Sequence, residues 1–258
     1  MVELPHQTLT GKVAIVTGAS RGLGATIATD LAKRGARVVL SYTSANSKSK
    51  AENTVNEIKS YGNGSDAIAV CGDLGQVETP DDIVKQTLEA FGPRIDILVN
   101  NAGVELQKPM VEITAADHDK LYNVNVRAPH LLTRAVTPHL RTPARIINVS
   151  SIAARSKYAN CSLYVSSKAA LEGATRVWAE EFGNSGTTVN AVAPGPIMTD
   201  MLANFPQEAI DIQKEAASVE RRLGTPQDIA NVVAWLAGNE SGWISGQTIN
   251  ASGGNTMY

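Results

Sequence analysis

The sequence predicts an α/β protein in which a doubly wound, parallel sheet of seven strands carries helices on both faces. Short β-branched runs alternate with helix-length amphipathic segments along the whole chain, which is the pattern of strand–helix–strand units. The runs are almost continuously apolar, as in Val-Ala-Ile-Val and Ile-Leu-Val. Strands that are buried on both faces have this character, and parallel sheets are built from such strands.

The individual elements follow from these runs and from the periodicity of the segments between them. The strands are expected at residues 13–17, 38–42, 67–71, 95–100, 145–150, 188–193 and 247–250. The helices are expected at residues 22–34, 48–61, 80–91, 115–140, 164–183 and 226–238. In 164–183, apolar residues recur at the spacing of one helix face, at Leu171, Ala174, Val177, Trp178 and Phe182.

No Ser/Pro-rich linker, charge block or low-complexity tract interrupts the alternation, so we expect one domain over residues 1–258. The segment 196–225 departs from the regular pattern and is most simply an insertion over the carboxyl edge of the sheet. We expect it to form a lid over a substrate; an inert loop is the alternative.

The composition narrows the class of partner. The net charge is −2, without the basic excess typical of proteins that bind nucleic acid or anionic membranes. The sequence lacks an apolar run that could span a bilayer, and its start resembles neither a signal peptide nor a transit peptide. We therefore expect a cytoplasmic protein that binds a small molecule, with no nucleic acid and no membrane partner.

Cysteine and histidine show no metal-binding or disulfide pattern. Cys71 and Cys161 lie in different segments without CxxC spacing, so a disulfide is not expected. Cys161 lies three residues before Tyr164. The four histidines have neither HxxxH nor HExxH spacing. We expect no metal site.

A glycine-rich turn follows the first expected strand and opens the first expected helix. Its sequence is Thr17-Gly-Ala-Ser-Arg-Gly-Leu-Gly24. Glycines let the backbone turn sharply and approach a pyrophosphate, whose charge is met by free N–H groups at the helix N-terminus. The spacing is GxxxGxG and not the general GxGxxG. We predict that a dinucleotide contacts Gly18, Ser20, Arg21, Gly22, Leu23 and Gly24.

The end of the second strand indicates which dinucleotide is bound. An acidic residue there would bind the 2′-hydroxyl of NAD, but the sequence Val38-Val-Leu-Ser-Tyr-Thr-Ser44 contains none. Arg21, Tyr42 and Ser44 could instead bind a 2′-phosphate, because guanidinium and hydroxyl groups donate to phosphate oxygens. We predict NADPH/NADP+ as the cofactor; the alternative is that Arg21 only covers the helix end.

Tyr164 and Lys168 are four residues apart in an expected helix, so they share one face. An ammonium beside a phenol favours the phenolate, and we expect Lys168 to lower the pKa of Tyr164 from about 10 toward neutrality. Such a tyrosine could donate and recover a proton. Ser151, at the end of the preceding strand, could hold a carbonyl oxygen at the same place. The alternative is a tyrosine and a lysine on a solvated helix face.

Taken together, these motifs resemble those of the short-chain dehydrogenase/reductase family in its common, single-domain type. The resemblance extends from Lys12 to about Gly254. Ser151 lies thirteen residues before Tyr164, which is the family spacing and favours it over Ser150 as the catalytic serine. The family marks, in order, are Thr17-Gly18-x-x-x-Gly22-x-Gly24, Asp73-Leu74, Asn100-Asn101-Ala102-Gly103, Asn125, Ser151, Tyr164-x-x-x-Lys168 and Pro194-Gly195.

This resemblance implies a Rossmann fold and a catalytic set of Asn125, Ser151, Tyr164 and Lys168. In the family, a water held by the asparagine links it to the lysine in a proton relay. Pro129 lacks an N–H and so leaves the carbonyl of Asn125 without its usual helical partner, which gives this role a physical reason here. A helix simply kinked by the proline is the alternative.

The resemblance also implies further cofactor contacts. Asp73 and Leu74 would lie near the adenine, although Asp73 could equally cap the following turn. The nicotinamide ribose would lie against Tyr164 and Lys168. The remaining implied contacts are Asn101, Ala102 and Gly103 beside the adenosine ribose, and Pro194, Gly195, Ile197 and Thr199 around the nicotinamide and phosphates.

The missing acid and the Arg21/Tyr42/Ser44 pattern look most similar to NADPH-dependent ketoreductases, including bacterial oxoacyl reductases and fungal polyketide or naphthol reductases. The resemblance thus implies reduction of a ketone on a medium-sized, partly hydrophobic substrate, by a homo-tetramer or homo-dimer. The expected pocket residues are Glu105, Leu106, Ala153, Arg155, Tyr158, Cys161 and the segment 198–205. A non-redox biosynthetic role, such as cyclisation or dehydration, and a cofactor-sensing role without turnover are the alternatives.

Overall fold

The computed structural model describes residues 6–199 and 206–258. Seven parallel strands form one sheet with the order β3-β2-β1-β4-β5-β6-β7. The strands are β1 (Val13–Val16), β2 (Arg37–Tyr42), β3 (Asp66–Cys71), β4 (Ile95–Asn100), β5 (Leu140–Val149), β6 (Thr188–Pro194) and β7 (Thr248–Ala251). The predicted doubly wound parallel sheet is therefore confirmed.

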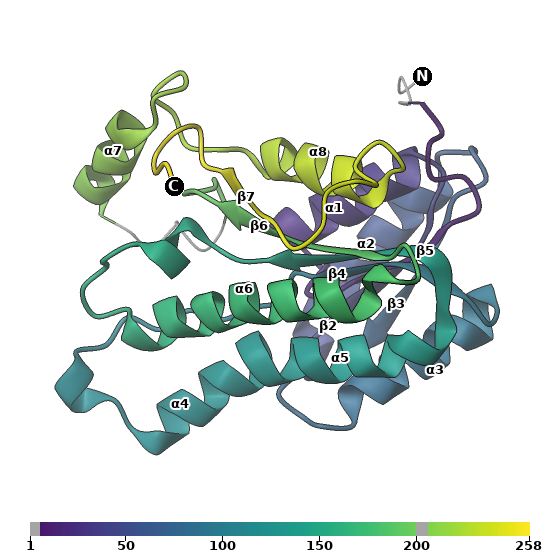
Figure 1. Ribbon diagram of the computed structural model, residues 1–258, viewed down its shortest axis with the longest axis horizontal. Coiled ribbons are helices and arrows are strands. Elements are labelled where there is room, and N and C mark those ends of the chain that lie inside the picture. Colours follow the sequence, from purple (N-terminus) through teal and green to yellow (C-terminus); the bar gives the residue numbers. More distant parts are fainter. Residues whose placement is uncertain (1–5, 200–205) are drawn as a thin grey trace.

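Helices cover both faces of the sheet (Figure 1). One face carries α1 (Gly22–Lys33), α2 (Lys48–Lys59) and α8 (Pro226–Ala237). The other face carries α3 (Thr79–Phe91), α5 (Ala128–Val136) and α6 (Ser162–Gly183). Among the described residues, no helix is both long enough and apolar enough to cross a membrane.

The sheet separates two hydrophobic cores, one on each face. In β1, Ala14 and Val16 pack into the core beneath α1 and α8, whereas Val13 and Ile15 pack into the core beneath α5 and α6. All four side chains are buried, because successive side chains of a strand point to opposite faces of the sheet. This two-sided burial is the physical reason for the uninterrupted apolar runs in the sequence.

Two helices begin with a capping box that the local sequence specifies. Thr225 caps α8, where its side chain accepts from the backbone N–H of Asp228 and the Asp228 carboxylate accepts from the backbone N–H of Thr225. Thr114 and Asp117 form the same arrangement at α4 (Ala115–Tyr122). Each box satisfies backbone N–H groups that a helix start leaves without partners.

The helix expected at 115–140 is confirmed as a continuous helical segment over residues 115–139, but it is not regular throughout. The segment is α4, then a π-helical turn over Asn123–Arg127, then α5, and β5 begins at Leu140. Pro129 lies in the first turn of α5, and a proline there cannot donate to the preceding turn. At the other end, Leu140 pairs with Ile95 ahead of an irregularity in the β4–β5 ladder, so the strand starts earlier than expected.

Beyond β6, the chain forms α7 (Gln207–Ala216), which lies near the described C-terminal residues (Figure 1). A parallel bridge joins Ile197 to Gly224 and returns this segment to the sheet edge. Residues 200–205, which belong to the expected lid, lie outside the described residues. The lid stays a prediction.

A buried polar network lies on the face of the sheet that α5 and α6 cover, here called the second core. The Asn100 side-chain amide donates to Asn148 Oδ1 at 2.9 Å, and Asn148 Nδ2 donates to Thr175 Oγ1 at 2.9 Å. These three residues are at most 3% exposed. The network ties β4 to β5 and β5 to α6, and therefore fixes α6 relative to the carboxyl ends of the strands.

We predict that Asn148→Ala lowers the free energy of unfolding by about 1–3 kcal/mol, because it leaves the buried Asn100 amide without its main acceptor. Asn46→Ala, at an exposed position in a short 3-10 turn, should change it by less than about 0.5 kcal/mol. Urea unfolding midpoints of the two variants measure the difference, and equal midpoints would contradict the role of the network.

Candidate active site

The glycine-rich turn between β1 and α1 is packed too closely for side chains at two of its positions. A Cβ on Gly24 would lie 2.3 Å from the Gly18 carbonyl oxygen and 2.6 Å from Asn101 Nδ2. A Cβ on Gly18 would lie 3.0 Å from Ala102 Cα, and Gly18 has a φ of +63° that favours glycine. The turn can therefore fold tightly against the end of β4.

The ends of β1 and β4 are joined by one threonine. Thr17 Oγ1 accepts from the backbone N–H groups of Asn101 at 3.0 Å and Ala102 at 2.9 Å. The Asn101 side-chain amide donates to the Thr17 carbonyl at 2.8 Å. These bonds bring the glycine turn beside the Asn-Ala-Gly turn. Ser20 and Arg21 belong to the same β1–α1 connection, with Arg21 exposed at the N-cap of α1, and Leu23 lies in the first turn of α1.

Two of the predicted cofactor residues, Tyr42 and Ser44, lie at the end of β2, and they differ in exposure to solvent. Ser44 is exposed and caps a short 3-10 turn. The Tyr42 side chain is instead buried and hydrogen-bonded to Cys71, and burial raises the pKa of its hydroxyl. Of these two side chains, therefore, only that of Ser44 faces solvent.

Asp73 and Leu74 follow β3. Asp73 is exposed and its Oδ1 accepts from the backbone N–H of Gly75 at 2.8 Å. Its carbonyl accepts from Thr79 Oγ1 at 2.7 Å. Asp73 thus stabilises the turn that leads into α3, as the alternative interpretation expected. Leu74 is buried in the second core.

The end of β6 also lies at the carboxyl edge of the sheet, beside the end of β7. A Cβ on Gly195 would lie 2.8 Å from Ser252 Cβ, so only glycine fits between the β6 and β7 ends. Pro194 and Ile197 are buried. Thr199 lies beside the glycine turn, since a Cβ on Gly22 would be 3.8 Å from its Cγ2. Residues distant in sequence therefore meet at the carboxyl edge.

The candidate catalytic side chains converge at this edge. The Ser151 side chain faces the Tyr164 hydroxyl closely enough to lower its pKa. Lys168 is 4% exposed; its Nζ lies 5.9 Å from the Tyr164 ring centroid and donates to the Val149 carbonyl at 2.8 Å. Ser150, which directly precedes Ser151, is buried, and its hydroxyl donates to Glu172 Oε1 at 3.0 Å.

Asn125 lies in the π-helical turn and is 1% exposed. Its side chain makes two backbone bonds to Val104, accepting from the N–H and donating to the carbonyl, both at 2.9 Å. A third bond goes from Nδ2 to Ser167 Oγ at 3.1 Å. Asn125 therefore connects the turn after β4 to the helix that carries Tyr164 and Lys168.

Gly103 lies between two of these residues. A Cβ on it would be 3.2 Å from Lys168 Nζ and 3.5 Å from Asn125 Oδ1. Any side chain at this position would crowd the buried ammonium. Because Gly103 has no side chain, the Lys168 ammonium and the Asn125 side chain can both lie beside it.

The expected lowering of the Tyr164 pKa is wrong for the protein alone. Burial raises the pKa of Tyr164 to about 12, against a smaller lowering by the Ser151 side chain, and the nearby Glu105 and Cys161 raise it further. Burial also lowers the pKa of Lys168 to about 8. Desolvation disfavours the charged forms of both groups. The spacing of Tyr164 and Lys168 along the helix does not show how deeply either group is buried.

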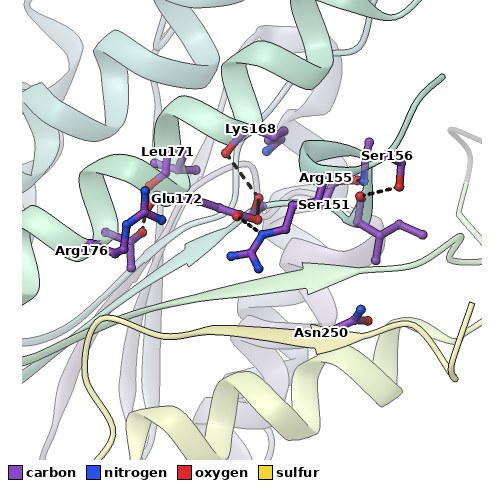
Figure 2. Close-up of polar contacts among 12 residues, drawn as sticks. Ser151, Arg155, Ser156, Lys168, Leu171, Glu172, Arg176 and Asn250 are labelled. Atoms are coloured by element: carbon purple, nitrogen blue, oxygen red, sulfur yellow. Dashed lines mark hydrogen bonds and ion pairs between the residues drawn. The ribbon is translucent and has the colours of Figure 1, made fainter. Parts of the chain in front are cut away.

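Glu172 lies one helical turn after Lys168 and was not predicted as a site residue. Its carboxylate is buried and binds both Ser150 and Arg155 (Figure 2). The available signal was its spacing of four residues from Lys168 on the helix face that meets the strand ends.

Comparison with known proteins agrees with this geometry. The family model described as enoyl-(acyl carrier protein) reductase matches residues 18–256. The hydroxynaphthalene reductase-like protein Arp2 of Metarhizium robertsii is 43% identical over 262 residues, covering 96% of each chain. The short-chain dehydrogenase/reductase FrzI of Cladobotryum sp. is 42% identical over 257 residues, covering 97% of this chain and 98% of FrzI. The chain belongs to the short-chain dehydrogenase/reductase family.

Solved structures of this family superpose closely. A blue fluorescent protein from a metagenomic library, in complex with NADPH, has a TM-score of 0.91 at 38% identity, covering 97% of this chain and 100% of that chain. The angucycline C-6 ketoreductase LanV, with bound NADP, has a TM-score of 0.90 at 32% identity, covering 98% of each. This short-chain dehydrogenase/reductase is thus similar along nearly its whole length to proteins crystallised with NADPH or NADP.

We predict that Gly24→Ala weakens NADPH binding by about tenfold or more, equivalent to about 1.4 kcal/mol, because the new Cβ must displace the Gly18 carbonyl or Asn101. The matched control is Gly183→Ala at the end of α6, where a Cβ meets nothing within 4 Å. Fluorescence titration with NADPH measures both affinities. Unchanged affinity in the Gly24 variant would contradict a tight phosphate-binding turn.

Proposed function

We propose that this protein reduces a ketone to an alcohol with NADPH, using Tyr164 as the proton donor. The observation that carries the proposal is that the Tyr164 hydroxyl lies where the Ser151 hydroxyl acts on its pKa, beside a buried Lys168 at the carboxyl edge of the sheet. Open α/β sheets bind ligands at this edge, where the strand order reverses. The reductase names of the relatives and the NADPH and NADP bound by the neighbouring structures support it.

The residues at the edge fit a dinucleotide phosphate. Because Gly18 and Gly24 have no side chains, the glycine turn packs closely against the Asn101-Ala102 backbone. The N-terminus of α1 offers N–H groups to a pyrophosphate. Ser44 and Arg21 are exposed near the position where a 2′-phosphate would need donors. The β2 end lacks a carboxylate that would repel this phosphate. NADPH is accordingly proposed over NADH.

Each catalytic residue has a role that its position supports. When bound, NADPH would supply the hydride. Ser151 would hold the ketone oxygen, and Tyr164 would donate a proton to it as the alcohol forms. Lys168 would bind the nicotinamide ribose hydroxyls and stabilise the tyrosinate left behind, since a nearby cation favours the charged phenolate.

Asn125 would support Lys168 without touching the substrate. Its amide and carbonyl groups hold the backbone of Val104, and Gly103 leaves room for the lysine next to it. A water held near its main chain would pass protons toward Lys168. Leu74, Pro194, Gly195, Ile197 and Thr199 would shape the cofactor groove, and Asp73 would lie near the adenine.

The non-redox alternative has less support, because Asn125, Ser151, Tyr164 and Lys168 are all present and the similar proteins are named reductases. We propose a medium-sized, partly hydrophobic ketone as substrate. The homo-tetramer or homo-dimer, the cytoplasmic location and the lid over 196–225 stay predictions from the sequence.

We predict that Tyr164→Phe lowers turnover by roughly 10²- to 10⁴-fold, the usual contribution of a positioned proton donor, while NADPH affinity stays within about threefold. The assay is NADPH oxidation with cyclic ketones, aryl ketones, quinones and β-keto esters, run in parallel with NADH. The matched control is Tyr61→Phe, after α2, whose hydroxyl binds Glu57. Near-normal turnover of the Tyr164 variant would contradict the proposed role.

We also predict that kcat/KM for NADPH falls as pH rises through about 8, by about tenfold per pH unit, because Lys168 loses its proton near that pH. Below pH 8 the ammonium is present and the rate should be constant. Tyr164, with its pKa near 12, keeps its proton throughout the range. Initial rates from pH 6 to 10 at constant ionic strength measure this profile. A flat profile to pH 10 would show that protonated Lys168 is not required.

A further inference from the structure

Glu172 is a buried carboxylate for which the proposed chemistry has no direct use. It lies in α6 and is 3% exposed. Its Oε1 accepts from Ser150 Oγ at 3.0 Å, and its Oε2 accepts from Arg155 Nε at 2.8 Å (Figure 2). A buried charge is costly unless it is paired, and both oxygens of this one have a partner.

The two partners flank the catalytic serine in sequence. Ser150 directly precedes Ser151, and Arg155 ends the 3-10 turn Ile152–Arg155 that Ser151 caps. The Ser151 hydroxyl also accepts from the backbone N–H of Ala153 at 3.1 Å, within the same turn. A single carboxylate on α6 thereby anchors the backbone on both sides of Ser151.

Arg155 makes a second contact on its outer side. Its guanidinium carbon lies 4.4 Å from the ring centroid of Tyr258, which is within the range of a cation–π interaction. The Arg155 side chain is 40% exposed, so the tyrosine covers part of it. Tyr258 itself is 48% exposed, so the pair lies at the surface.

Tyr258 belongs to residues 252–258, here called the return segment, which is held at several points. The Asn250 side chain, from β7, donates to the Thr256 carbonyl at 2.7 Å. The backbone N–H of Val219 donates to the Gly253 carbonyl at 2.9 Å, and Asn255 Nδ2 donates to the carbonyl of Gln213 in α7 at 3.3 Å. The return segment therefore joins the α7 region to Arg155.

We propose that Glu172, Arg155 and Tyr258 are positioning residues that set the orientation of the Ser151 hydroxyl, an inference that rests on the proposed function. The return segment brings Tyr258 against Arg155, and Glu172 binds both Arg155 and Ser150. Loss of any contact would loosen the turn after Ser151. A displacement of about 1 Å at a catalytic group can cost about 10²-fold in rate, and partial loosening should cost about tenfold.

The first experiment compares Arg155→Met and Tyr258→Ala with Tyr258→Phe, which keeps the ring. We expect kcat for ketone reduction to fall by about tenfold in Arg155→Met and by a smaller factor in Tyr258→Ala. NADPH affinity should stay unchanged in both, and Tyr258→Phe should retain wild-type kcat. The melting temperature of each variant monitors folding. Equal losses in Tyr258→Phe and Tyr258→Ala, or an unchanged kcat in folded Arg155→Met, would overturn the inference.

The second experiment asks whether Arg155 acts through Ser151. Residues that act as one unit have non-additive effects, so Arg155→Met should cause no further loss of kcat when Ser151→Ala is already present. An additional tenfold loss in the double variant would assign Arg155 a different role. Absence of ketone turnover by the wild-type protein would instead refute the proposed function itself.

Discussion

The parallel pairing of β1 with β4, and of β4 with β5, is the constraint on which the site depends. Parallel neighbours require crossover connections, so the chain must leave each strand at the same edge. The glycine turn, the Asn-Ala-Gly turn and the serine pair Ser150-Ser151 follow three adjacent strands and therefore meet. Thr17 secures the first junction by accepting two N–H groups from the end of β4.

The helices that cover these strands supply the remaining groups, and they do so at an energetic cost. Lys168, Glu172 and Asn125 are all less than 5% exposed, although each carries a charge or an amide. Buried polar groups persist when their partners compensate for lost water. Here the partners are the Val149 carbonyl, the Ser150–Arg155 pair and the backbone of Val104. The site is thus held by polar bonds that an apolar core would not need.

Burial shifts the pKa values of Tyr164 and Lys168 in opposite directions. Burial keeps the proton on Tyr164 and makes the Lys168 ammonium easier to deprotonate. A group that holds its proton at neutral pH is suited to act as an acid, and the direction of reduction needs an acid. Glu105 and Cys161, both near the tyrosine, add to the same tendency. Two residues of the expected substrate pocket therefore act electrostatically on the Tyr164 hydroxyl.

The sequence by itself determined the parallel sheet, its seven strands and the residues that stand at their carboxyl ends. These features depend on local patterns: apolar runs buried on both faces, glycines at tight turns, and the spacing of Tyr164 from Lys168. Only the tertiary structure decided the π-helical turn at Asn123–Arg127, the raised pKa of Tyr164, the burial of Tyr42 and the contact between Tyr258 and Arg155. Desolvation and contacts between distant segments arise from the packing of the whole chain, and no short stretch of sequence records them.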